Sequence, residues 1–148
     1  MEKSPTDSLK KEHDIVLKIL NKIEKGIMDK NLKLLQKEIS ILEKEFDKHS
    51  LTKEEKILFP EIEKFIPREG GPTGMMIHEH KELVNLIKEF KSAIKLKNFQ
   101  KLSDSGNNIL SILRPHIDKE NNILFMISDM HLTDKQKQKI LDKFKKVN

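Results

Sequence analysis

The chain contains no cysteine, tryptophan or tyrosine among its 148 residues. The absence of cysteine excludes disulfides and thiolate ligands, so any metal site must use nitrogen and oxygen ligands. The absence of tyrosine excludes a tyrosyl radical and a phenolate metal ligand. The remaining possibilities for a metal site are imidazole, carboxylate and other oxygen donors.

Glycine and proline are also scarce, with five of each, whereas charged residues make up 36% of the chain. This balance, rich in lysine, glutamate, leucine and isoleucine, favours long amphipathic helices over strands. No apolar run approaches the length of a membrane span, and the N-terminal residues lack the apolar core of a signal peptide. We therefore expect a cytoplasmic protein with no membrane partner, of a size suited to one domain.

The formal net charge is +5, a sign that could indicate nucleic acid or anionic lipid as a partner. Lysine and glutamate alternate through most of the chain, however, and the aromatic platforms of single-strand-binding proteins are missing. Only residues 135–146 are locally basic. We expect a solvated polar surface and no nucleic-acid partner.

Apolar residues recur at heptad-like spacing in four segments, residues 9–27, 35–65, 76–94 and 102–127. Gly70, Gly71 and Pro72 break the chain at its middle, and Thr133 looks like the cap of a short fifth helix ending near residue 147. Short connections between long helices predict an all-α, up-down-up-down antiparallel four-helix bundle. We expect a single domain over residues 1–148, with the bundle at about 6–130 and a helical tail at about 133–147.

The two halves of the chain repeat each other. Glu12-His13 recurs as Glu79-His80 after 67 residues, and the segment that begins at His49 recurs from His116 after the same interval. A duplication that keeps histidines and glutamates in register with an apolar pattern is typical of a symmetric metal site inside a helical bundle.

Four histidines lie in register with the apolar stripes and should point inward; they are His13, His49, His80 and His116. A lone inward histidine is usually structural, but four of them beside Glu54 and Glu120 would be costly to bury without a shared partner. At about 1.5 Å per residue, His13, His80, Glu54 and Glu120 bring ligands from all four helices to about 10–17 Å from one end of an antiparallel bundle. Such a ligand set suits iron, zinc, copper or manganese, and carboxylates from opposite helices can bridge two ions.

The halves differ in the spacing between histidine and glutamate. His116 and Glu120 are four residues apart, which places both on one face of an α-helix. Glu54 follows His49 by five residues, so it faces the site only if the helix carries a π-bulge or a similar irregularity. An unbroken α-helix there would contradict the assignment.

Glu54 is chosen over the adjacent Glu55 because of its distance to the Leu-Phe pair that occurs in both halves of the chain. Glu54 lies five residues before Phe59, and the same interval separates Glu120 from Phe125 in the second half.

Other polar residues near the site keep two interpretations each. His78 lies about 200° around the helix from His80, and it is either a fifth or outer ligand, reached by distortion, or a residue outside the site. Glu12 and Glu79 are either outer acceptors that fix ring tautomers or solvated helix residues. We expect His131 at the surface, at the end of the bundle.

Three segments together resemble the hemerythrin-like family, also called the HHE cation-binding domain: residues 49–60, 68–80 and 116–125. The resemblance covers the chain through Met130 and implies a four-helix bundle with two iron ions, oxo- or hydroxo-bridged, that bind dioxygen or related small molecules. Carried over by position, the family's metal ligands fall on His13, His49, Glu54, His80, His116 and Glu120.

One feature departs from the oxygen-carrying hemerythrins, which have a fifth histidine in a His-x-x-x-His pair on the third helix. The residues four positions either side of His80 are Met76 and Val84. Each iron would then be about one ligand short, which leaves room for exogenous ligands at both metals. We therefore favour a protein that binds or senses dioxygen, peroxide or nitric oxide over a simple oxygen carrier or a dedicated enzyme.

Two other functions remain open at this point. One is a di-iron oxidoreductase, or a protein that repairs iron centres. The other is a structural or metal-storage helical bundle without a redox role.

Overall fold

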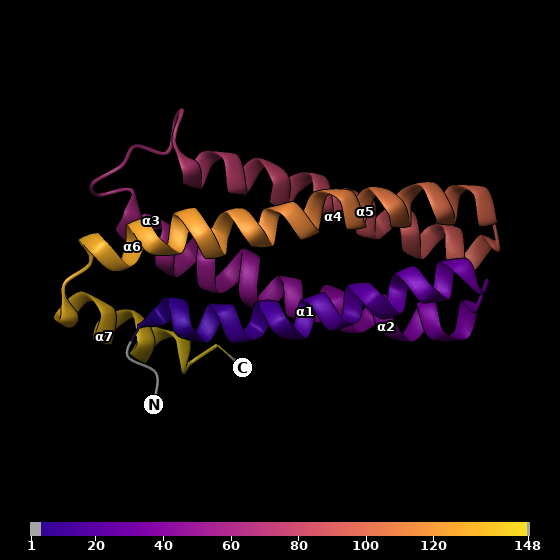
Figure 1. Ribbon diagram of the computed structural model, residues 1–148, viewed down its shortest axis with the longest axis horizontal. Coiled ribbons are helices and arrows are strands. Elements are labelled where there is room, and N and C mark those ends of the chain that lie inside the picture. The colour runs from indigo at the N-terminus through magenta and orange to yellow at the C-terminus, as the bar shows by residue number, and fades with distance from the viewer. Residues whose placement is uncertain (1–3, 148) are drawn as a thin grey trace.

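Four long helical runs lie side by side along the longest axis of the molecule (Figure 1). The computed structural model describes residues 4–147, and every regular element in that range is helical. The first run is α1 (Pro5–Met28), and the third is α4 (Pro72–Leu96).

The second run comprises α2 (Leu32–Phe46), the π-helical stretch η1 (Asp47–Leu58) and α3 (Phe59–Ile62). The fourth comprises α5 (Phe99–Lys119), a second π-helical stretch η2 (Glu120–Leu124) and α6 (Phe125–His131), after which α7 (Asp134–Phe144) follows. The predicted all-α class is confirmed, and the arrangement is consistent with a hemerythrin-like helical bundle.

Side-chain caps begin the first and last helices. Ser4 caps α1 in a capping box with Asp7, and Thr133 caps α7 in a capping box with Gln136. The short helix predicted after Thr133 is therefore present. It ends at Phe144, three residues before the predicted end near residue 147, and its buried residues are Ile140, Leu141 and Phe144.

Each long run packs against two neighbours. α1 contacts α2 and α5, and α4 contacts the same two helices. Figure 1 shows the α1–α2 and α4–α5 connections at one end of the molecule and the α3–α4 connection at the other. The beginnings of α1 and α4 therefore lie at the same end as α3 and α6.

The apolar core is divided into two clusters along these helices. The larger cluster fills the end near the α1–α2 connection, with Leu20, Leu35 and Phe90 among its buried members. The smaller cluster lies at the other end, where α7 packs on α1 and η1 and places Phe144 near Leu9. In the first three runs a predicted site histidine lies between the buried residues of one cluster and those of the other, and in the fourth run Glu120 does.

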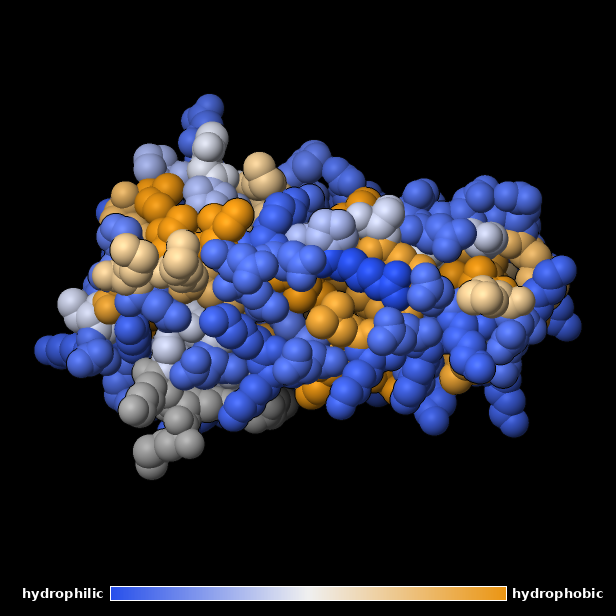
Figure 2. Space-filling model, in the orientation of Figure 1, coloured by the Kyte–Doolittle hydropathy of each residue, from blue (hydrophilic) through white to orange (hydrophobic). Residues whose placement is uncertain are grey.

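The surface has the polar character predicted from the sequence. Figure 2 shows hydrophilic side chains over most of the face in view. Across residues 4–147, no helix combines the length and the apolar character needed to cross a bilayer.

Gly106 allows α5 to approach α1 and α4 closely, and we predict that Gly106→Ala destabilises the fold. An added Cβ would lie 2.5 Å from Ile27 Cδ1 and 2.7 Å from Cε1 of Phe90, which is fully buried. Overpacking of this kind costs about 1–3 kcal/mol, more than the gain in helix propensity of about 1 kcal/mol. Urea denaturation of the variant measures the loss. Ser111→Ala, at an exposed position of the same helix, is the control, and a Gly106→Ala protein as stable as this control would contradict the prediction.

Candidate metal centre

The six side chains predicted from the sequence converge in one layer between the two apolar clusters. None of them exposes more than 3% of its surface. Their nitrogen and oxygen atoms form two groups, and within each group the atoms lie within 4.8 Å of one another. One group consists of His13, His49, Glu54 and Glu120, and the other of Glu54, His80, His116 and Glu120. Both glutamates belong to both groups, as expected of carboxylates that bridge two ions.

The π-helical stretch η1 brings Glu54 into this layer. The irregularity predicted between His49 and Glu54 is confirmed, and it is longer than a single bulge because all of Asp47–Leu58 is π-helical. Hydrogen bonds of a π-helix span five residues, so side chains five positions apart can share a face. His49 Nε2 and Glu54 Oε2 are consequently 3.0 Å apart.

The second π-helical stretch, η2, was not predicted. His116 and Glu120 keep the α-helical spacing, with 3.5 Å between Nε2 and Oε1, and the irregularity begins only at Glu120. The Phe125 N–H donates to the carbonyl of Glu120, just as the Phe59 N–H donates to that of Glu54. The two halves thus return to α-helix at equivalent phenylalanines.

Each of the four imidazoles is held through Nδ1 by an oxygen outside the cluster. The distances are 2.7 Å from His13 to Asn121, 2.9 Å from His49 to Glu12, 2.6 Å from His80 to Glu55 and 2.8 Å from His116 to Glu79. Because Nδ1–H donates to these acceptors, Nε2 is left as a lone pair that points into the cluster. This is the tautomer that a metal ligand requires.

Glu12 and Glu79 are therefore outer acceptors and not solvated helix residues. Each accepts a hydrogen bond from a histidine of another helix. Lys53 forms an ion pair with Glu12, and Lys119 forms one with Glu79. Burial disfavours the charged form of both carboxylates, but the hydrogen bonds from histidine and lysine outweigh it and lower the pKa of each.

Two phenylalanines fix the imidazoles from the side of the smaller apolar cluster. Phe59 stacks on His80 with 6.1 Å between ring centroids, and Phe125 stacks on His13 at 5.4 Å. These contacts pair residues from opposite halves of the repeat and keep water away from the rings.

The inner atoms of the cluster lack the partners that burial demands. His80 Nε2 and His116 Nε2 lie 3.2 Å apart, and when both rings are neutral with Nδ1 protonated, each inner nitrogen carries a lone pair. His49 Nε2, both carboxylate oxygens of Glu54 and Oε2 of Glu120 are buried without a hydrogen-bond partner. Facing lone pairs and unpaired carboxylate oxygens are costly in an apolar interior. A shared cation removes that cost, so the residues present fit a bound metal.

Comparison with known families agrees with this chemistry. Residues 4–127 match the family model of the hemerythrin HHE cation-binding domain. The chain belongs to this family. No curated protein and no solved structure matches the chain. The matched range of this hemerythrin domain includes all six converging side chains and all four outer acceptors.

The other two histidines of the hemerythrin domain lie outside the cluster. The His78 side chain is 74% exposed and pairs with Glu82 at 2.8 Å, so the fifth-ligand interpretation is wrong. His131 is exposed at the end of α6, as predicted, and stacks on Phe65.

A small cavity of about 10 Å³ lies beside the layer and is lined by His13, His49 and His116. This volume accommodates about one water-sized molecule. Its lining includes Glu45, a half-buried residue one helical turn before His49 that the sequence analysis missed. The spacing of four residues from His49 is the signal that would have identified it.

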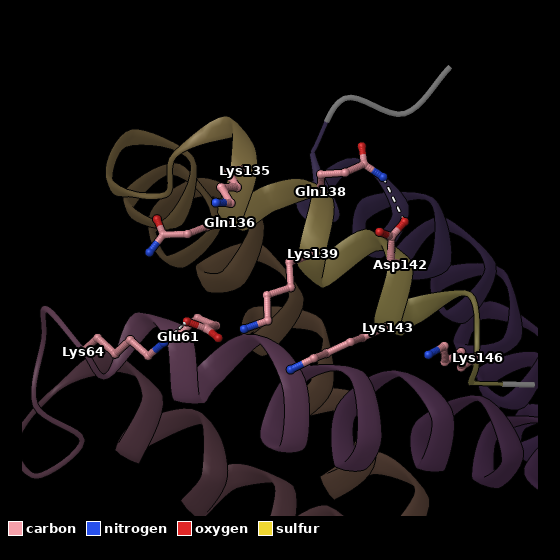
Figure 3. Close-up of a pocket in the computed structure, with 9 residues that line it drawn as sticks. All are labelled: Glu61, Lys64, Lys135, Gln136, Gln138, Lys139, Asp142, Lys143 and Lys146. Atoms are coloured by element: carbon pink, nitrogen blue, oxygen red, sulfur yellow. Dashed lines mark hydrogen bonds and ion pairs between the residues drawn. The ribbon is translucent and has the colours of Figure 1, made fainter.

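A larger groove of about 850 Å³ lies between α7 and α3 and does not include any of the six side chains (Figure 3). Lys139 and Lys143 reach into it from α7, opposite Glu61 and Lys64. The groove is therefore separate from the candidate metal centre.

In the absence of metal, protons are the cations that this cluster attracts. Burial disfavours the charged form of His80, but its hydrogen bonds to Glu54 and Glu55 outweigh this and raise its pKa to about 9. The pKa of His116 is raised as well, and that of the Glu120 carboxyl is well below its ordinary value, because each group favours the charge of the other despite burial.

We predict that the metal-free protein loses stability as the pH rises from about 6.5 to about 9. A histidine whose pKa is higher in the folded state contributes fully below its unfolded pKa of 6.5, and this contribution disappears as the pH passes its folded value. For His80 the loss is roughly 3 kcal/mol. Urea denaturation after chelation, across this pH range, measures it. Metal-loaded protein is the control and should not show the decline; constant or rising stability of the metal-free form would contradict the prediction.

Proposed function

We propose that this hemerythrin domain holds two iron ions and uses them to bind or sense dioxygen, peroxide or nitric oxide. The ligands are the six converging side chains His13, His49, Glu54, His80, His116 and Glu120. The observation that carries the proposal is the pair of donor groups that share both glutamates, in which four buried inner atoms have no hydrogen-bond partner.

The donor set favours iron over the alternatives that require sulfur or all-oxygen ligands. Imidazole and carboxylate together suit iron, and the chain has no thiolate to offer. Bound iron would supply open coordination positions and a change of oxidation state. The protein's own residues hold the imidazoles in one tautomer through Nδ1, stack against the rings and keep bulk water out of the layer.

The space beside the site suits a small, uncharged ligand. The cavity of about 10 Å³ is lined on its apolar side by Val16, Leu42 and Leu113, which are all buried. A diatomic molecule or peroxide is of the size that such a space admits, whereas a larger organic substrate is not.

We further infer the topology of the family for this chain, an up-down-up-down antiparallel four-helix bundle in a single domain over residues 1–148. The alternating direction of the four runs supports this topology (Figure 1). The packing of α7 on α1 and η1 supports including the C-terminal helix in the same domain.

Anaerobic loading with ferrous iron, followed by metal analysis, tests the ligand set. We expect about two iron ions per chain for the unaltered protein and for His78→Ala, because the His78 side chain faces solvent. His80→Ala should retain fewer ions, because His80 is a buried donor. It lies on the same helix as His78, only two residues further along the chain. Circular dichroism shows whether the variant remains helical. An unaltered protein without iron, or a helical His80→Ala protein with both ions, would overturn the assignment.

Exposure of the iron-loaded protein to nitric oxide, peroxide and dioxygen tests the role of the pair. The chain lacks tryptophan and tyrosine, so charge-transfer bands of the iron stand out from the protein absorption. We expect at least one of these molecules to change the bands in a saturable way. Unchanged bands would support a structural or storage role instead, and repeatable oxygen uptake and release without oxidation would indicate a carrier.

A further inference from the structure

The two donor groups have the same inner composition but different outer partners. Each shared glutamate is followed by a residue that reaches across the layer to the Nδ1 of a histidine from the other half. After Glu54 this residue is Glu55, whose carboxylate lies 2.6 Å from His80. After Glu120 it is Asn121, whose neutral amide oxygen lies 2.7 Å from His13. The duplication therefore places a charged acceptor behind one group and an uncharged acceptor behind the other.

An anionic acceptor makes an imidazole a stronger ligand than a neutral acceptor does. A carboxylate at Nδ1–H draws the proton away from the ring and raises the electron density at Nε2. Loss of such an outer partner typically lowers metal affinity by about 10–100-fold. His80 should accordingly hold a metal more strongly than His13.

The two ion pairs behind the other histidines differ in the same direction. Glu12 is paired with Lys53, whose side chain is only 10% exposed and lies under the Phe144 ring of α7. Glu79 is paired with Lys119, whose side chain is 36% exposed. The charge of a buried lysine is less screened by water. Lys53 should therefore repel a metal ion at His49 more strongly than Lys119 repels one at His116.

We propose that the two metal positions are unequal: the position between His80 and His116 binds its ion more tightly and fills first. The position between His13 and His49 is the weaker one and the one that exchanges its ion. This proposal rests on the proposed function, because it presupposes that both groups bind metal.

Anaerobic titration of the full chain with Co²⁺ tests the order of filling. Calorimetry should resolve two affinities that differ by at least about 10-fold. In a sample with labelled histidine rings and one equivalent of diamagnetic Zn²⁺, the NMR signals of His80 and His116 should shift while those of His13 and His49 keep their positions. Equal affinities, simultaneous shifts of all four signals, or earlier shifts of His13 and His49 would overturn the proposal.

Swapping the charges of the two outer acceptors, Glu55 and Asn121, tests whether they cause the difference in affinity. Glu55→Gln should weaken the tighter position, and Asn121→Asp should strengthen the weaker one, so that the double variant reduces or reverses the difference. Glu82→Gln and Asn107→Asp make the same charge changes at exposed positions and should leave both affinities unchanged. If the exchange leaves the order of filling unchanged, the outer acceptors do not set it.

The outcomes separate this proposal from the one on which it rests. Absence of Co²⁺ binding, together with absence of iron binding, would refute the metal centre itself. Binding of two ions with equal affinity would leave the metal centre intact and refute only the inequality.

Discussion

The fold depends on a layer of ionisable side chains buried between two apolar clusters. Four inner atoms of this layer, His49 Nε2, both carboxylate oxygens of Glu54 and Oε2 of Glu120, have no hydrogen-bond partner. An interior of low polarity penalises such atoms strongly. Protons relieve part of this penalty, which explains why the pKa of His80 rises to about 9. Metal cations would relieve it more completely, since each can serve several donors at once. Binding of cations to this layer would therefore stabilise the core.

The duplicated sequence builds this layer by exchange between its halves. Glu12 and Glu79 orient histidines within their own halves, whereas Glu55 and Asn121 orient histidines of the opposite half. The stacking phenylalanines also cross from one half to the other. Neither half alone would complete either donor group, because the two shared glutamates come from different halves. The outer acceptors break the match between the halves, because Asn121 stands in the second half where the first half has Glu55.

Much of this could be read from the sequence because the signals were periodic or repeated. The apolar stripes predicted the long helices, and the five-residue interval from His49 predicted a π-helical irregularity before Glu54. The stretch η2 gave no such signal, since Glu120 already lies on the correct face for an α-helix. The role of Asn121 was missed because an amide beside a ligand is not a recognisable motif, and it becomes meaningful only through its distance to His13. Such contacts depend on the packing between helices, which spacing along one chain does not specify.

We propose that both donor groups belong to a single two-metal centre bridged by Glu54 and Glu120. X-ray absorption spectroscopy at the iron edge, on protein loaded anaerobically with ferrous iron, tests whether the two ions are neighbours. We expect iron with mixed nitrogen and oxygen ligands and a second iron within roughly 4 Å. Iron without a metal neighbour, or bound by oxygen ligands alone, would contradict it.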